Sequence, residues 1–172
     1  MNELLSLLEH NARRPLPELS AVLKRSEYEV GKEIKAMEDE RIILGYHTLI
    51  DWNKAGVDKV TAFIEVNLTP QRDVGFDAIA DRISRFDEVR SVYLMSGNFD
   101  LLVIVEESSL QAIADFIAQR LATIDGVTST RSHFMLKPYK KDGLMTGPKE
   151  RDHRLADDME KEMGFRPHGE EW

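Results

Sequence analysis

The chain has 172 residues with 42% hydrophobic content, which suffices for one ordinary domain or two small ones. Its formal net charge of -8 argues against a nonspecific nucleic-acid binder, because phosphate neutralisation needs a basic surface, and the absence of cysteine excludes disulfides, thiol catalysis and thiolate metal sites. No stretch approaches the roughly 20 apolar residues of a membrane span, and no signal peptide is recognisable, so we expect a cytoplasmic protein without membrane contact.

The first 50 residues read as helices followed by an extended segment. Apolar residues at helical spacing predict three short helices, over 3–12, 16–24 and 26–40. Pro15 ends the first helix, since it disfavours a helical residue before it, and Ser26 is the expected N-cap of the third. We expect a strand in the extended stretch 42–50. This order of elements is typical of a winged helix-turn-helix, whose third helix enters a DNA groove.

A different pattern begins near residue 60. Strands are predicted at 60–68, 89–95, 101–105 and 128–136, and helices around 76–83 and 110–121. Two βαβ-like halves of this kind make a ferredoxin-like sandwich, so the fold class is α+β. The run Leu101 to Val105 is apolar without a break, which indicates a strand covered on both faces. Helices cover one face, and we expect a second copy of the chain to cover the other.

These patterns divide the chain into four parts. We expect a winged helix-turn-helix domain over 1–51, a linker over 52–59, a ferredoxin-like domain over 60–140 and a polar tail over 141–172. The tail carries only a faint apolar stripe of Leu155, Met159 and Met163, which allows one weak helix at most.

Three stretches, in the correct order, resemble the Lrp/AsnC family of feast-or-famine transcriptional regulators over residues 1 to about 140. The first is Glu18-Leu19-Ser20 followed by Ser26 and the third helix, and the second is RIILGY at 41–46 leading through Asp51 to Gly56. The third pairs the turn Gly97-x-x-Asp100 with Gly126-Val127, Thr130 and Ser132.

The resemblance implies a DNA-binding regulator that responds to a small effector. Members of this family read DNA with the third helix, and their second domain is a RAM-type ferredoxin-like sandwich. They pair as homodimers through the sheets, assemble further into tetramers or octamers, and bind amino acids in clefts between dimers. No cofactor and no catalytic activity are implied.

The candidate DNA-contacting residues surround the expected turn between the second and third helices. They are Arg13, Arg14, Lys24, Arg25, Ser26, Tyr28, Lys32 and Lys35. The third helix, however, sets two lysines against six acidic residues, a balance of -4 that suits a phosphate surface poorly. Glu33 falls where the family commonly has arginine, and Lys24 and Arg25 replace the usual glycine and apolar residue of the turn.

The candidate effector-binding residues are Gly97, Asn98, Asp100, Thr130 and Ser132. Glycine lets a backbone approach a ligand, the Asp100 carboxylate suits an ammonium group, and the two hydroxyls suit a carboxylate. An alternative stays open for each: Asp100 can tie the turn through an Asx-type hydrogen bond, and the hydroxyls can simply be solvated.

Two other functions remain as alternatives. One is a sensor or assembly protein of the same fold whose acidic third helix has lost DNA binding. The other is a subunit of the siroheme-type tetrapyrrole decarboxylases, which share this two-domain plan. They resemble one another by arginine- and histidine-rich stretches after the wing, and here that place holds Gly45-Tyr46-His47-Thr48 without an arginine cluster. Neither the five histidines nor any serine or lysine shows metal-binding or nucleophile spacing, so we expect no metal site and no enzyme. In the tail, a solvated acidic face is favoured over a cation site at Asp152, His153, Asp157 and Asp158.

Overall fold

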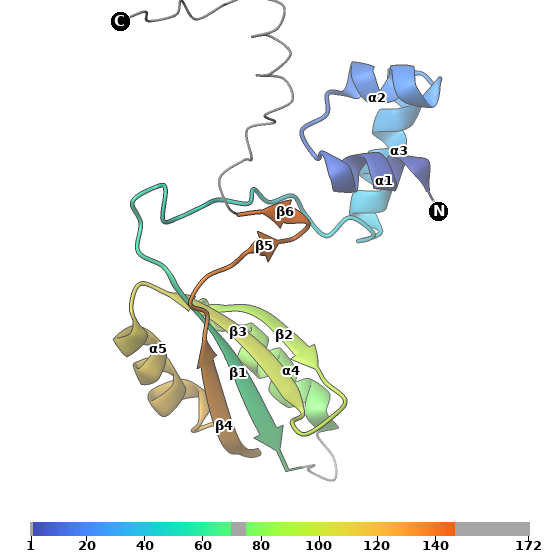
Figure 1. The fold of residues 1–172 in the computed structure, drawn as a ribbon. Coiled ribbons are helices and arrows are strands. Elements are labelled where there is room, and N and C mark those ends of the chain that lie inside the picture. Colours follow the sequence, from blue (N-terminus) through green and yellow to red (C-terminus); the bar gives the residue numbers. More distant parts are fainter. Residues whose placement is uncertain (1, 70–74, 147–172) are drawn as a thin grey trace, which may run out of the picture. The chain divides into compact units, whose positions relative to one another are not determined.

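The computed structural model describes residues 2–69 and 75–146, which form two compact units (Figure 1). Residues 1–50 make the N-terminal unit, and the C-terminal unit begins at Asp51. Both the helix allowed at 155–163 and the acidic group around His153 lie outside the described residues. Within the described ranges, no helix is long and apolar enough to cross a membrane.

The N-terminal unit contains the three predicted helices, α1 (Glu3–His10), α2 (Leu16–Leu23) and α3 (Glu27–Asp39). The three helices share a small hydrophobic core of buried side chains: Leu4, Leu8, Leu19, Val30 and Met37. This small core explains why short helices of limited intrinsic stability persist, since most helical stability in proteins comes from packing of an apolar face.

The turn between α2 and α3 is set by two local devices. Lys24 ends α2 in the left-handed conformation, with φ of 55° and ψ of 41°. Ser26 then caps α3: its hydroxyl accepts from the backbone of Glu29, and the Glu29 carboxylate accepts from the backbone of Ser26 at 3.0 Å. The prediction that Ser26 is the N-cap is confirmed, and the cap fixes where α3 begins.

The strand expected over 42–50 is not formed. After α3 the backbone N–H groups of Ile42 and Ile43 both donate to the Met37 carbonyl, and the chain then runs on without ladder hydrogen bonds. A strand needs a partner for its backbone groups, and the described part of the N-terminal unit offers no second extended segment. The stretch leaves large apolar side chains exposed, Leu44 at 81% among them.

The C-terminal unit is the predicted α+β sandwich. Its elements are β1 (Val60–Leu68), α4 (Gly75–Ser84), β2 (Val89–Leu94), β3 (Leu101–Glu107), α5 (Leu110–Phe116), η1 (Ile117–Leu121) and β4 (Val127–Phe134). The four strands are antiparallel in the order β2-β3-β1-β4, with α4 behind them in Figure 1. Alternate residues of β1 and β3, such as Ile64 and Val103, fill the core on the helix side. The sheet therefore has one helix-covered face and one open face.

Two details of this unit differ from the sequence-based expectation. The helix predicted over 110–121 is α-helical only to Phe116 and continues as the π-helical turn η1, in which Ala122 N–H donates to the Ile117 carbonyl. The boundary expected at residue 140 cuts through a small hairpin, β5 (Lys140–Lys141) and β6 (Leu144–Met145). The Asp142-Gly143 pair at its turn is a hairpin signal that the polar composition concealed.

Candidate nucleic-acid interface and effector site

The outward face of α3 carries both lysines of this helix and one acidic residue, Asp39. A helix turns by about 100° per residue, so four side chains fall within a sector roughly 60° wide: Tyr28, Lys32, Lys35 and Asp39. This sector, which we call the outer stripe, lies opposite the buried residues Val30 and Met37. Tyr28 is 78% exposed in the first turn. None of the five glutamates in the stretch 27–40 lies in the outer stripe.

Glu33, the acid that stands where the family resemblance implies arginine, has two partners within the unit. One carboxylate oxygen accepts from Asn2 Nδ2 at 3.0 Å, and the other meets Arg25 Nη1 at 2.5 Å. The hydrogen bond from Asn2, and then that from Arg25, lowers the pKa of Glu33 below its ordinary value. The Glu33 carboxylate is therefore paired, and it links α3 to the residue before α1 and to the turn between α2 and α3.

Three more acidic residues of α3 also have partners within the unit. Glu29 belongs to the capping box, and its hydrogen bonds from Ser26 lower its pKa. Glu38 accepts from the Tyr46 hydroxyl at 3.0 Å, and Asp39 pairs with Lys35 Nζ at 2.6 Å. Most of the acidic charge counted in the sequence is thus turned away from the outer stripe or paired.

The candidate DNA-contacting residues fall into two groups. Arg14 pairs with Glu18 at 3.2 Å, Arg25 with Glu33 and Lys35 with Asp39, while Ser26 is engaged in the cap. The others are exposed and have no acidic partner among the described residues: Arg13, Lys24, Tyr28 and Lys32. Sequence reasoning missed Asn2 and Tyr46. An asparagine just before a helix signals a cap, but its second contact with Glu33 depends on tertiary packing.

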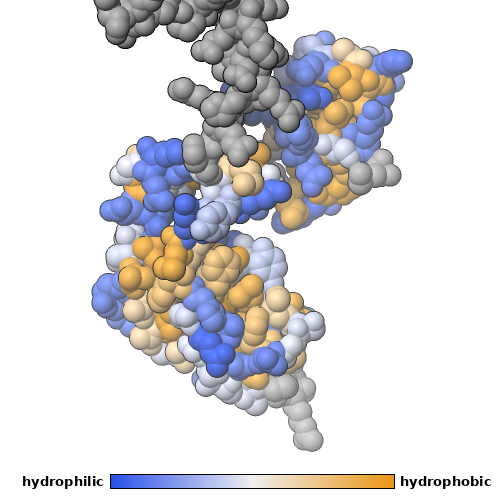
Figure 2. Space-filling model, in the orientation of Figure 1, coloured by the Kyte–Doolittle hydropathy of each residue, from blue (hydrophilic) through white to orange (hydrophobic). Residues whose placement is uncertain are grey.

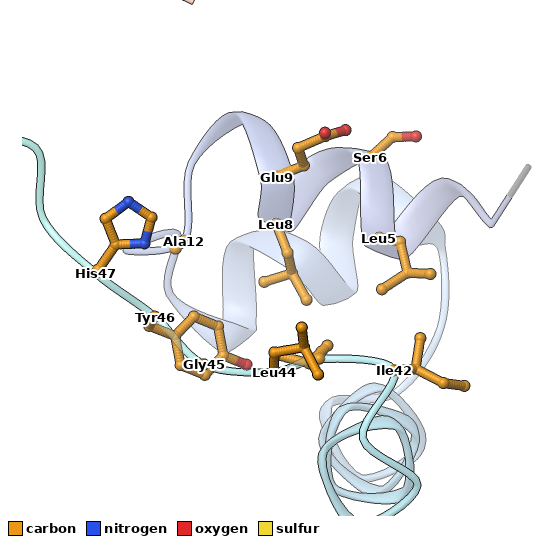
Figure 3. Close-up of a pocket in the computed structure, with 11 residues that line it drawn as sticks. Leu5, Ser6, Leu8, Glu9, Ala12, Ile42, Leu44, Gly45, Tyr46 and His47 are labelled. Atoms are coloured by element: carbon orange, nitrogen blue, oxygen red, sulfur yellow. The ribbon is translucent and has the colours of Figure 1, made fainter. Parts of the chain in front are cut away.

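A groove of about 580 Å³ lies in the N-terminal unit between α1 and the segment 42–47. Figure 3 shows Leu5 and Leu8 pointing toward this segment, while Ser6 and Glu9 lie on the other side of the helix. Because its polar groups do not converge on a common point, the groove has the character of an apolar contact surface.

The turn between β2 and β3 holds three of the candidate effector residues. Gly97 has φ of 147°, a conformation that L side chains rarely adopt, and Asn98 is exposed. Asp100 donates its backbone N–H to the Val66 carbonyl at 3.0 Å, and its Oδ2 accepts from Leu68 N–H at 2.7 Å. The carboxylate therefore ties the turn to the end of β1, rather than to the turn's own backbone. No hydrogen bond to Oδ1 is found within the described ranges.

Thr130 and Ser132 do not meet this turn within one chain. In β4 they pair with Val66 and Ile64 of β1, so they share the helix-covered face with those buried residues. Because β1 also pairs with β3, the backbones of β4 and β3 lie roughly 10 Å apart. Both hydroxyl residues are half-buried.

Polar groups that sequence reasoning missed connect β1 and β4 at the same end of the sheet. Asn67 Nδ2 donates to Ser129 Oγ at 2.9 Å, and Thr128 Oγ1 donates to the Asn67 carbonyl at 3.0 Å. Alternation along β1 placed Asn67 on the face opposite the core, but its partner was not evident because cross-strand register was unknown.

The open face of the sheet has an apolar centre with charged residues beside it. Phe63 of β1 pairs with Ile104 of β3, and both are half-buried. Toward β4, the Glu65 carboxylate lies 3.0 Å from His133 Nε2 and 3.6 Å from Arg131 Nη1. Figure 2 shows hydrophobic side chains gathered over the strands of this unit next to hydrophilic ones.

The described residues contain no group of three or more histidines and acids that could hold a metal ion.

Comparison with known proteins gives consistent results over most of the chain. Residues 61–145 match the family model described as the Lrp/AsnC ligand binding domain. An HTH-type transcriptional regulator of Bacillus subtilis (strain 168), YugG, is 43% identical over 90% of this chain and 93% of its own length. The HTH-type transcriptional regulator LrpA of Pyrococcus abyssi is 31% identical, over 80% of this chain and 94% of its own. A solved feast or famine regulatory protein from M. tuberculosis, complexed with L-methionine, is 25% identical with a TM-score of 0.67, covering 84% of this chain and 95% of that one.

Proposed function

Because this chain belongs to the Lrp/AsnC family of transcriptional regulators, we propose that its N-terminal unit binds double-stranded DNA and that its C-terminal unit binds an amino acid. The observation that carries the proposal is the charge segregation on α3. Its outer stripe presents Tyr28, Lys32 and Lys35, with Asp39 paired to Lys35. The carboxylates of Glu29, Glu33 and Glu38 have partners within the unit, away from this stripe. In a helix-turn-helix, side chains on the N-terminal part of the second helix of the motif reach base edges in the major groove.

The phosphate contacts in this scheme come from around the turn. Arg13 and Lys24 are exposed cations without an acidic partner among the described residues, and Ser26 begins α3. Arg25 and Arg14 would have to exchange their glutamate partners for phosphate, so we assign them a smaller part. Segments 1–51 and 60–140 are taken as the DNA-binding and the effector and assembly domains, joined by residues 52–59.

The effector half of the proposal rests on the β2–β3 turn. Gly97 leaves open space where a side chain would stand, and Asp100 keeps one carboxylate oxygen without a hydrogen bond from the described residues. Such a group suits the ammonium of an amino acid. The methionine complex of the M. tuberculosis relative supports this ligand class. Thr130 and Ser132 are separated from Asp100 by β1, so we place their contribution in a site that includes a second copy.

Assembly follows from the open face of the sheet. We propose that the surface around Phe63 and Ile104 pairs with the same surface of a second copy, since β-sheets commonly bury such faces against each other. Dimers would then associate further into tetramers or octamers around the effector. A ligand that binds one arrangement better shifts the population toward it and changes the spacing of the α3 helices.

The rival function is a sensor of the same fold that does not bind DNA. This alternative rests on the excess of acidic residues in α3. The contacts of Glu33, Glu29 and Glu38 weaken it, because these carboxylates have partners within the unit. The decarboxylase alternative has no support from the relatives, which are transcriptional regulators.

The direct test is binding of the full chain to the DNA upstream of its own gene over a series of salt concentrations. We expect the logarithm of the association constant to fall linearly with the logarithm of salt, with a slope that indicates several phosphate contacts. Absence of binding at low salt would favour the sensor. A thermal-shift screen of the twenty amino acids tests the effector half, because a ligand of the folded state raises the unfolding midpoint.

A further inference from the structure

Lys32 differs from the other lysine of the outer stripe, Lys35, and from Arg25 in the turn. Lys35 is paired with Asp39, and Arg25 is paired with Glu33. Lys32 is exposed and has no hydrogen bond or ion pair among the described residues. It lies one helical turn after Tyr28, on the same face. It is therefore the cation of α3 whose ammonium is available to a groove without first breaking an internal contact.

We propose that Lys32 determines sequence specificity by donating to one guanine in each DNA half-site, a step that rests on the proposed DNA-binding function. In the major groove, guanine presents two acceptors, N7 and O6, and lysine and arginine are their usual partners. The other bases do not offer this pair of acceptors at the same edge. Tyr28, in the first turn and 78% exposed, lies one helical turn before Lys32 on the same face.

The acidic residues near Lys32 in the sequence have partners other than Lys32. Glu33 is adjacent in sequence, but Asn2 and Arg25 hold its carboxylate on another side of α3. Glu29, three residues earlier, is held by the capping box. Because these carboxylates have other partners, the ammonium of Lys32 is available to an acceptor in the groove.

The test compares two lysine variants against DNA selected by the wild-type chain from a random duplex library. Lys32→Met keeps the length and apolar stem of the side chain and removes the donor. Lys24→Met is the matched control, because Lys24 is an exposed cation on the turn outside the outer stripe. Affinities are measured for the selected duplex, for every single-base substitution, and for duplexes with 7-deazaguanine at each guanine.

We expect the wild type to lose affinity when one guanine in each half-site is replaced, or when its N7 is removed. In Lys32→Met the discrimination at that guanine should fall by a factor between about 5 and about 150, with other positions unchanged. Lys24→Met should weaken binding to all sequences alike and reduce the salt slope by about 1.

The possible results separate this inference from the function on which it rests. If the wild type binds selected DNA but Lys32→Met keeps the same guanine preference and the same sensitivity to 7-deazaguanine, Lys32 is not the reader. If the wild type selects no DNA at low salt, the proposed function fails and the role of Lys32 fails with it.

Discussion

Glu33 shows how a residue that looks unfavourable for DNA binding can support the DNA-binding unit. Its two oxygens are taken by Asn2, the N-cap of α1, and by Arg25, in the turn before α3. The side chain therefore joins three parts of the unit that are distant in sequence.

The lowered pKa of Glu33 predicts a pH dependence of stability. The folded state favours the charged carboxylate, so this stabilisation is present above the ordinary value of 4.5 and is lost as the pH falls through the lower folded value. Glu33→Gln should reduce the free energy of unfolding at pH 7 and flatten its decline below pH 4.5, measured by urea unfolding followed by circular dichroism. Arg25→Met should reproduce part of the loss. Equal declines in wild type and Glu33→Gln would refute this role.

Asp100 allows the effector contact to be separated from the structural contact. In Asp100→Asn an amide oxygen can still accept from Leu68 N–H, so the fold should persist while the charge that attracts an ammonium is gone. Asp100→Ala should lose about 1–3 kcal/mol of stability in addition, because the buried N–H loses a charged partner. We expect both variants to lose the amino-acid thermal shift. A full shift in Asp100→Asn would remove Asp100 from the binding site.

At the scale of elements, α3 contains one glycine, which should lower the stability of the N-terminal unit by a measurable amount. Gly31 lies in the middle of the helix, and a Cβ built there would stand 3.5 Å from Leu16 Cδ2, an ordinary contact. Gly31→Ala should therefore stabilise the N-terminal unit by about 0.5–1 kcal/mol. Both tryptophans lie outside this unit, so the suitable measurement is hydrogen-exchange protection of α2 and α3 amides. Lower protection in the variant would show that the contact between residue 31 and Leu16 cannot accommodate a methyl group.

Local patterns were enough to predict most elements, because capping, turns and side-chain periodicity are encoded within a few residues. Ser26 identified the start of α3, and alternation in 60–68 gave the bounds of β1. The absent strand at 42–50 could not be foreseen, since a strand depends on a partner elsewhere in the chain. The same limit applies to sites: Asn2, Glu33 and Arg25 are brought together only by packing, and β1 separates Thr130 from Asp100 only once the strand order is known.

At the scale of the whole molecule, the open face of the sheet predicts the assembly. Phe63→Glu places a charge at the centre of this face, next to Ile104, and should convert dimers or larger assemblies to monomers in sedimentation velocity. In the monomer the sheet keeps its hydrophobic core on the helix-covered face, so circular dichroism should still show a folded chain. Leu110→Glu, at an exposed position on α5, is the matched control and should leave the assembly intact. An unchanged sedimentation coefficient in Phe63→Glu would place the interface elsewhere.

The proposed function requires that effector binding in the C-terminal unit is coupled to DNA binding in the N-terminal unit. The most direct test is to titrate its upstream DNA with and without the amino acid that gives the largest thermal shift, at fixed salt. Coupling predicts that the DNA dissociation constant changes by a factor of about 5 to 150, and that DNA changes the affinity for the amino acid by the same factor. Identical DNA dissociation constants with and without the bound amino acid would contradict the account.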